Sequence, residues 1–160
     1  MAPAAGPGVL LNGARGTGGG DRAKVRRTSV NQLVGNAFVS VSVDHIDGVA
    51  RVTRSARRPE SVEEIVAAFD EAIASLDTLD RPSLRLLIDL RAAPGRNDAE
   101  FERAMATRRT QLIHAFAAVA ILVQTPVGEL QVGRLAREDG ANAKVFNDEA
   151  KALVWLAAKQ

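Results

Sequence analysis

Polar and charged side chains follow the apolar stretches of this 160-residue sequence, where strands are expected to end. Asp89, Arg91 and Arg96 surround the end of one apolar stretch, and Thr125 follows the next along the chain. In an open parallel sheet, ligands bind beside the edge formed by the carboxyl ends of the strands. Arginines close to helix N-termini can hold an anion there. The sequence therefore indicates a polar binding rim, although capped helices with solvated arginines would give the same pattern.

Residue types that carry out catalysis are scarce in the chain. There is no cysteine, which excludes disulfides, thiolate zinc sites and cysteine nucleophiles. The two histidines, His45 and His114, fall in a predicted turn and at a predicted helix end. No serine lies in a Gly-x-Ser-x-Gly elbow. The paired carboxylates at 63–64 and 70–71 are expected on the exposed side of a helix. We therefore expect no catalytic residues, no metal and no cofactor.

The positive charge of the chain is concentrated at its N-terminus. Residues 1–30 carry five Lys or Arg and one Asp, whereas the remaining residues carry 16 bases and 18 acids. The whole chain has five Phe, one Trp and no Tyr. A nucleic-acid-binding surface needs bases clustered on the folded part and aromatic side chains that stack on nucleobases. Nucleic-acid binding is therefore not expected.

The first 35 residues differ in composition from the rest. Seven of the 13 glycines lie within the first 20 positions, and such a segment buries too little apolar surface to offset the entropy of ordering it. We predict a disordered Gly/Arg-rich tail over residues 1–35, part of which could reflect a mis-set start codon, and one domain over residues 36–160. The longest apolar stretch has nine residues, whereas a membrane span needs about 20. The expected location is the cytoplasm.

The domain alternates strand and helix patterns. Val39, Val41 and Val43 alternate with serines, which predicts a strand over residues 37–44 with one wet face. Further strands are predicted at 49–55, 84–90, 117–123 and 143–146, and helices at 62–76, 98–114, 126–139 and 149–159. This alternation predicts a single layered α/β domain with a mostly parallel five-stranded sheet. Its first strand would be antiparallel at one edge, and about four helices would flank the sheet.

Short polar side chains mark where three of these helices begin. Ser61 and Glu64 have the spacing of a capping box, in which each side chain accepts a hydrogen bond from the other residue's backbone N–H. One residue of the pair at 97–98 is expected to cap the second helix, and one residue of the pair at 147–148 the last helix.

Three features favour docking to a protein partner. Residues 60–80 contain seven Asp or Glu and no Lys or Arg, whereas the charged residues at 51–58 are all arginines. Adjacent patches of opposite charge suit a protein interface, or they screen each other within the chain. Arg108 and Arg109 flank the apolar stripe of the second helix and either extend over the core or line a cavity or interface. Trp155 would be an interface anchor if it is exposed and part of the core if it is covered.

Residues 84–91, the loop after them and residues 145–156 resemble the STAS superfamily, in particular its SpoIIAA-like branch of small stand-alone bacterial proteins. An apolar strand ending in Asp-Leu, a helix-capping loop and a closing helix with the pattern Phe…Glu-Ala…Trp-Leu carry the resemblance. The order of elements agrees over residues 37–158. The resemblance implies the α/β fold described above and a regulatory role through protein–protein interaction.

Anti-sigma-factor antagonists of this superfamily carry an Asp-Ser pair in the loop after that strand, and a partner kinase phosphorylates the serine. In this chain Asn97 and Asp98 stand at that place, and there is no Ser or Thr between Ser83 and Thr107. Asp98 would either mimic the phosphorylated state or, as we favour, cap a helix. The resemblance thus implies a non-catalytic module that binds a protein partner without this phospho-switch.

Two other functions stay open. Related branches with this architecture carry lipids, so lipid or small-anion binding is the alternative, and an unrecognised enzyme comes third. The sequence does not determine the oligomeric state. The candidate binding residues are Asp89, Arg91, Arg96, Asn97, Asp98, Thr125 and Trp155.

Overall fold

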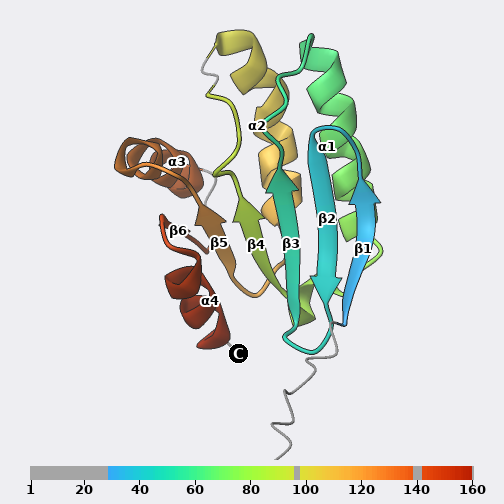
Figure 1. Ribbon diagram of the computed structural model, residues 1–160, viewed down its shortest axis with the longest axis vertical. Helices are drawn as coiled ribbons and strands as arrows, with labels where there is room; N and C mark the ends of the chain where they lie inside the picture. The colour runs from blue at the N-terminus through green and yellow to red at the C-terminus, as the bar shows by residue number, and fades with distance from the viewer. Residues whose placement is uncertain (1–28, 96–97, 139–141, 160) are drawn as a thin grey trace, which may run out of the picture.

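The structure, a computed structural model, describes residues 29–95, 98–138 and 142–159. The strands are β1 (Val30–Gly35), β2 (Val39–Asp44), β3 (Val49–Arg54), β4 (Arg85–Asp89), β5 (Val119–Leu122) and β6 (Ala143–Phe146). The helices are α1 (Val62–Leu76), α2 (Ala99–Ile113), α3 (Pro126–Glu138) and α4 (Glu149–Ala157), with a short 3-10 helix η1 (Arg81–Ser83). The strands form one sheet in the order in which they occur along the chain (Figure 1). β1, β2 and β3 pair antiparallel, and β3 to β6 pair parallel.

The predicted fold class is confirmed, with one additional strand. The sequence analysis assigned Val30–Gly35 to the N-terminal tail, but these residues form β1, so the described residues make a six-stranded sheet. All side chains of β1 except that of Val34 are exposed. Backbone pairing with β2 therefore holds the strand in place. Because this pairing does not require buried side chains on one face, the sequence of β1 shows no clear hydrophobic alternation. The antiparallel edge strand is β1 rather than β2. The rest of the predicted tail, residues 1–28, lies outside the described residues.

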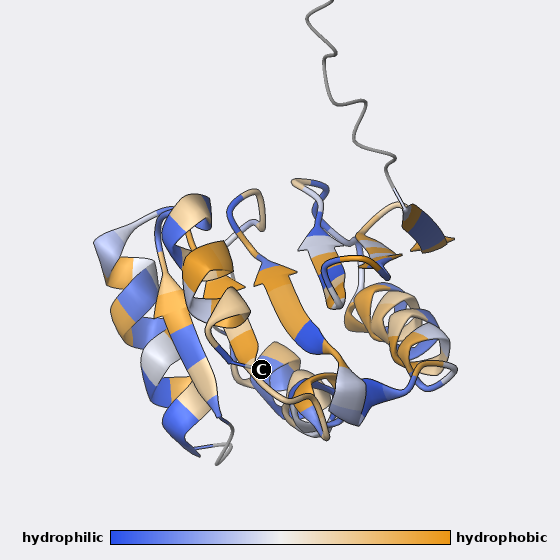
Figure 2. Ribbon diagram, turned by 90° about the horizontal axis from the view of Figure 1, so that it is seen from below, coloured by the Kyte–Doolittle hydropathy of each residue, from blue (hydrophilic) through white to orange (hydrophobic). Residues whose placement is uncertain are grey.

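The helices cover the two faces of the sheet unequally. Because β3 to β6 follow one another in order, right-handed crossovers place the three connecting helices on one face. Ala136 of α3 accordingly belongs to the same buried cluster as the apolar residues of α1 and α2. α4 follows the last strand and packs on the opposite face, where Ala152 and Leu156 join a smaller cluster (Figures 1 and 2). No helix of the described residues covers that opposite face at β1 and β2 (Figure 1).

Successive side chains of a strand point to opposite faces of the sheet, and this alternation divides the buried apolar residues between the two clusters. Val39, Val41 and Val43 are at most 1% exposed, whereas the serines between them are only half-buried, as predicted. Each fully buried valine stabilises the fold by about 1.5–3 kcal/mol relative to an exposed one. In β5, Val119 packs into the large cluster and Leu122 into the smaller one. β5 is thus buried on both faces, as its continuous apolar sequence predicts.

The predicted helix caps are present, and one of them differs in detail. Ser61 Oγ accepts a hydrogen bond from the Glu64 backbone N–H at 3.2 Å. The Glu64 carboxylate accepts its bond from the Glu60 N–H at 2.8 Å, so the second half of the predicted box is shifted by one residue. Asp98 caps α2 by accepting from the Phe101 N–H at 3.0 Å, and Asp148 caps α4 in the same way. Each such cap stabilises its helix by about 1 kcal/mol.

Candidate functional site

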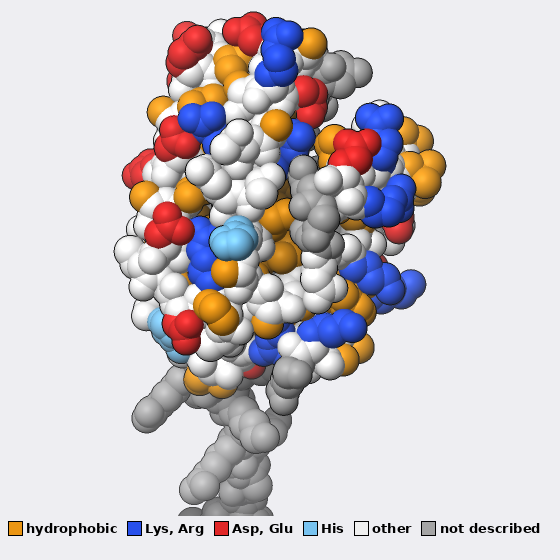
Figure 3. Space-filling view, turned by 180° about the vertical axis from the view of Figure 1, so that it is seen from behind, with side chains coloured by type: hydrophobic (Ala, Val, Ile, Leu, Met, Phe, Trp, Pro, Cys, Tyr) orange, Lys and Arg blue, Asp and Glu red, His pale blue; other side chains and the backbone are white. Residues whose placement is uncertain are grey.

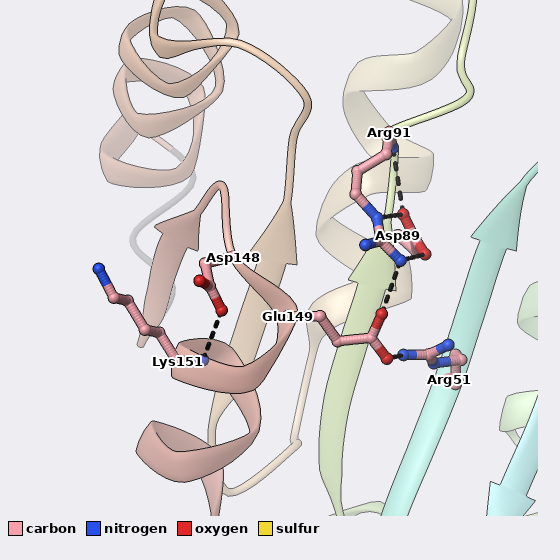
Figure 4. A network of polar contacts seen from close by, with 6 residues as sticks. All are labelled: Arg51, Asp89, Arg91, Asp148, Glu149 and Lys151. Carbon is pink, nitrogen blue, oxygen red and sulfur yellow. Dashed lines mark hydrogen bonds and ion pairs between the residues drawn. The ribbon is translucent and has the colours of Figure 1, made fainter.

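Asp89 and Arg91 form a two-pronged ion pair at the carboxyl end of β4. Asp89 is 6% exposed. Arg91 donates from Nε to Asp89 Oδ1 at 2.9 Å and from Nη2 to Oδ2 at 2.7 Å (Figure 4). The backbone N–H of Arg91 also donates to Oδ1, at 3.1 Å. Two parallel bonds between a guanidinium and a carboxylate fix the direction of both groups.

Glu149, in the first turn of α4, extends this pair into a network of four charges (Figure 4). Its carboxylate accepts from Arg91 Nη2 at 2.7 Å and also from Arg51 Nη2. Arg51 lies on β3, next to β4 in the sheet. The network therefore connects these two neighbouring strands to α4, on the face of the sheet opposite α1, α2 and α3. Two arginines and two carboxylates make the group neutral as a whole.

Neighbouring charges keep both carboxyl groups of the network ionised. Hydrogen bonds from Arg91 hold the pKa of Asp89 below its ordinary value, although burial acts in the opposite direction. Burial opposes ionisation of Glu149 as well, but hydrogen bonds from Arg51 and Arg91 outweigh it and lower the pKa of that carboxyl. The pKa of Arg91 is raised, chiefly by its bonds to Asp89. Because Arg91 already serves two carboxylates, an incoming anion would have to displace one of them.

The structure brings only part of the predicted rim together. Asp89 and Arg91 are in direct contact, while Arg96 and Asn97 lie outside the described residues. Thr125 is exposed at the start of α3, where its Oγ1 accepts from the Gly128 N–H at 3.1 Å. Asp98 is also exposed, at the start of α2.

Trp155 lies on α4, on the side of the sheet opposite α1 and α2. It is half-buried, with its ring 5.7 Å from that of Phe146 at an interplanar angle of 53°. The Lys159 ammonium lies 5.3 Å from the centre of the Trp155 ring. The side chain is thus covered in part by Phe146 of β6, which places it between the two alternatives of the sequence analysis.

The acidic stretch of α1 is partly neutralised within the molecule. Asp70 receives two hydrogen bonds from Arg108 of α2, at 2.8 and 3.1 Å. The Glu71 carboxylate accepts from Asn36 Nδ2 at 2.9 Å. Arg108 therefore joins two helices of the same layer, and part of the predicted charge complementarity is internal.

A cleft of about 790 Å³ lies between α2, α3 and the ends of β4 and β5. Figure 3 views this face, where apolar side chains line the hollow between the two helices. The apolar lining includes Ile88, Leu90, Phe101, Met105, Ile121 and Val132. Thr125 and Arg91 of the predicted rim also line it, so the cleft lies at the sheet edge where the sequence analysis expected a site.

Sequence reasoning did not assign Arg54 to a binding site, although this residue lines the cleft. It is the last residue of β3 and is 7% exposed. The alternation of side chains along β3 could have indicated this position. Arg54 follows the buried Val52 by two residues, so both side chains point to the same face of the sheet. Arg109 of α2 also lines the cleft and donates to Glu102 Oε2 at 2.9 Å.

The described residues contain neither a cluster of metal-binding side chains nor a helix that could span a membrane. No group of three or more His, Cys, Asp or Glu side chains is placed to hold a metal ion among them. In the same residues, no helix has the length and apolar character needed to cross a bilayer.

Comparison with known proteins identifies the architecture. No protein-family model matches the sequence, and no curated protein is detectably similar to it. Among solved structures, the chain is similar to an uncharacterized protein of the DUF3478 family from Shewanella loihica PV-4, which is described as having a SpoIIAA-like fold. The match has a TM-score of 0.57 at 17% sequence identity and covers 77% of this chain and 98% of that one. The chain therefore has a SpoIIAA-like fold, as its sequence resemblance implied.

Proposed function

We propose that this protein is a non-catalytic interaction module of STAS-like type that binds a protein partner in the bacterial cytoplasm. The observation that carries the proposal is a set of exposed apolar side chains on the two helices that pack on β6. Leu130 and Val127 of α3 are 75% and 65% exposed, and Val154 of α4 is 71% exposed. Large apolar side chains gathered on a surface favour contact with another protein.

The position of β6 supports the same surface. β6 is the last strand of the sheet, so one of its edges faces away from β5. A strand edge offers backbone donors and acceptors to a partner strand. α3 and α4 lie on the two faces of the sheet beside this edge. A partner that pairs with β6 would therefore find apolar contacts on both sides of it.

Partner binding in this module would not depend on phosphorylation in the loop before α2. Asp98 stands near the place of the phosphorylated serine of anti-sigma-factor antagonists, and its carboxylate accepts the Phe101 N–H as a helix cap. A fixed carboxylate at a helix N-terminus stabilises the helix whatever the partner does. We therefore propose an interaction that is controlled by the partner's abundance and not by a kinase acting on this loop.

The test compares partner capture by three variants of the full chain. The unaltered chain is cross-linked in extract of the organism that encodes it, the captured protein is identified and purified, and its Kd is measured. Leu130→Asp and Val154→Asp should each weaken binding at least about tenfold, because each places a charge in the apolar surface. Ile46→Asp is the matched control, since Ile46 is also 71% exposed but lies in the β2–β3 turn. Equal binding by all three variants would contradict the proposed surface.

Lipid or small-anion binding is the second candidate function, and the cleft between α2 and α3 is the observation that favours it. Its volume of about 790 Å³ lies within the range of ligand sites in proteins, and such sites are predominantly apolar with a few polar groups. Val127 borders both the cleft and the exposed surface, whereas Leu130 and Val154 do not line the cleft. The two functions can therefore be tested independently.

A further inference from the structure

The cleft between α2, α3 and the sheet is apolar along most of its length. Ile88 and Ile121 come from neighbouring parallel strands and lie side by side in register. Met105 of α2 and Val132 of α3 line the cleft opposite them. An alkyl chain lying along these residues would lose its contact with water, which favours binding in proportion to the apolar area buried.

Arg54 places a buried positive charge on the wall of this cleft. Its Nη1 donates to the carbonyl oxygens of Ser55 at 2.8 Å and Phe38 at 3.3 Å, and its Nη2 donates to that of Arg57 at 3.1 Å. No carboxylate of the described residues forms an ion pair with Arg54, so its charge is balanced by carbonyl dipoles, the Ser55 hydroxyl and the Phe38 ring. Burial lowers its pKa, but an arginine stays protonated in proteins. Buried charges normally have an opposite charge beside them.

The guanidinium of Arg54 retains hydrogen-bonding capacity. A guanidinium has five N–H donors, and the bonds to backbone carbonyls use Nη1 and part of Nη2. Nε has no acceptor among the described residues. Nε and Nη2 together form the planar pair of donors that matches the two oxygens of a carboxylate.

The other charged residues of the cleft do not supply the missing negative charge. Arg91 is paired with Asp89 and Glu149, Arg134 with Glu138, and Arg109 with Glu102. Glu102 is the one acid among the described lining residues. Among the described lining residues, Arg54 is therefore the arginine without a carboxylate partner, and its charge favours an anionic ligand and disfavours a cationic one.

We propose that this cleft binds a single-chain amphiphile with a carboxylate head group. The carboxylate pairs with Arg54 at the end of β3, and the alkyl chain lies along Ile88, Ile121 and Val132. This inference rests on the second proposed function and names its ligand class. It is independent of partner binding at α3 and α4, so either can fail without the other.

The first experiment varies the ligand and leaves the protein unaltered. Dodecanoate, dodecylammonium and acetate are titrated into the full chain in a calorimeter, each below its micelle concentration. Dodecanoate should bind with one-to-one stoichiometry, and dodecylammonium should bind at least about tenfold more weakly because Arg54 repels it. Acetate should give no measurable heat, since it lacks the chain. No binding of dodecanoate, or equal binding of dodecanoate and dodecylammonium, would overturn the proposal.

The second experiment places the ligand within the protein. Val132→Phe narrows the cleft and should weaken dodecanoate binding at least about tenfold. Val30→Phe is the matched control, because it adds the same volume at an exposed position of β1 that does not line the cleft, and should leave the Kd unchanged. Arg54→Met should remove the preference for dodecanoate over dodecanol, and Arg54→Lys should retain part of it. If Arg54→Met fails to fold, the comparison of dodecanoate with dodecylammonium on the unaltered chain still tests whether the cleft prefers an anionic head group. Unchanged binding by Val132→Phe would overturn the assignment to this cleft.

Discussion

Arg91 donates to both carboxylate oxygens of Asp89, and its Nη2 also reaches Glu149 at 2.7 Å. One guanidinium therefore joins the end of β4 to the first turn of α4, two segments 58 residues apart in the chain. α4 covers only the smaller buried cluster, which contains Leu87, Leu122 and Leu156. The network thus adds a polar attachment where apolar burial is limited.

Removing Arg91 should destabilise the protein more than removing an exposed arginine. Arg91→Met would leave the buried carboxylate of Asp89 without a guanidinium, and the free energy of unfolding should fall by about 2–3 kcal/mol. Urea unfolding followed by fluorescence of Trp155, the single tryptophan of the chain, would measure the change. Arg103→Met, on the exposed side of α2, should change stability by about 0.5 kcal/mol or less. Equal effects of the two substitutions would contradict this role for Arg91.

The same network should make the protein sensitive to acid. The pKa values of Asp89 and Glu149 are lower in the folded protein than their ordinary values of 3.8 and 4.5. The unfolded chain therefore takes up protons first as the pH falls. The stabilisation is fully present above the ordinary values, and it is lost as the pH falls through them towards the lower folded values.

Urea unfolding measured from about pH 7 to about pH 3 should therefore show a falling free energy of unfolding in the acid part of that range. The double variant Asp89→Asn and Glu149→Gln should be less stable at neutral pH and show a shallower decline in acid. A decline as steep as that of the unaltered chain would mean that other carboxyl groups cause it. Asp44, whose pKa is lowered mainly by a hydrogen bond from Ser29, is the next group to replace in that case.

Gly48, in the turn between β2 and β3, should resist substitution by residues that carry a Cβ. Its φ is +64°, in the left-handed region, and a Cβ there would lie 3.3 Å from Arg85 Nη2. Gly48→Ala should lower the free energy of unfolding by about 1–2 kcal/mol. Gly48→Asn should cost less, since asparagine tolerates this conformation. Gly95→Ala is the control, because a Cβ there meets no atom within 4 Å. Thermal unfolding of the three variants would check this order.

Local patterns predicted most of the elements correctly. The alternation of Val39, Val41 and Val43 indicated β2, and the predicted strand at 143–146 matches β6. Asp98 was favoured as a helix cap, and it caps α2. These features depend on residues close together in the sequence, through strand periodicity of two and side-chain bonds to backbone groups three residues away.

The polar contacts of the site could not be predicted in the same way. Asp89 and Arg91 were identified as candidates because they follow an apolar strand. Their partner Glu149 lies 58 residues away from Arg91 and looked like an ordinary acid at the start of a helix. The place of Arg54 in the cleft was missed, because β3, α2 and α3 enclose that space only when the chain is folded.

The sequence by itself determined the layered α/β architecture, its helix caps and its alternating strands, because each of these follows from interactions among neighbouring residues. Only the tertiary structure decided that β1 pairs with β2, since that pairing uses backbone bonds that leave little trace in side-chain pattern. It also decided which charges meet, because the pairing of Arg91 with Glu149 requires β4 and α4 to be packed together. Long-range packing thus converts residues of ordinary type into a charged network on one face of the sheet and an apolar cleft on the other.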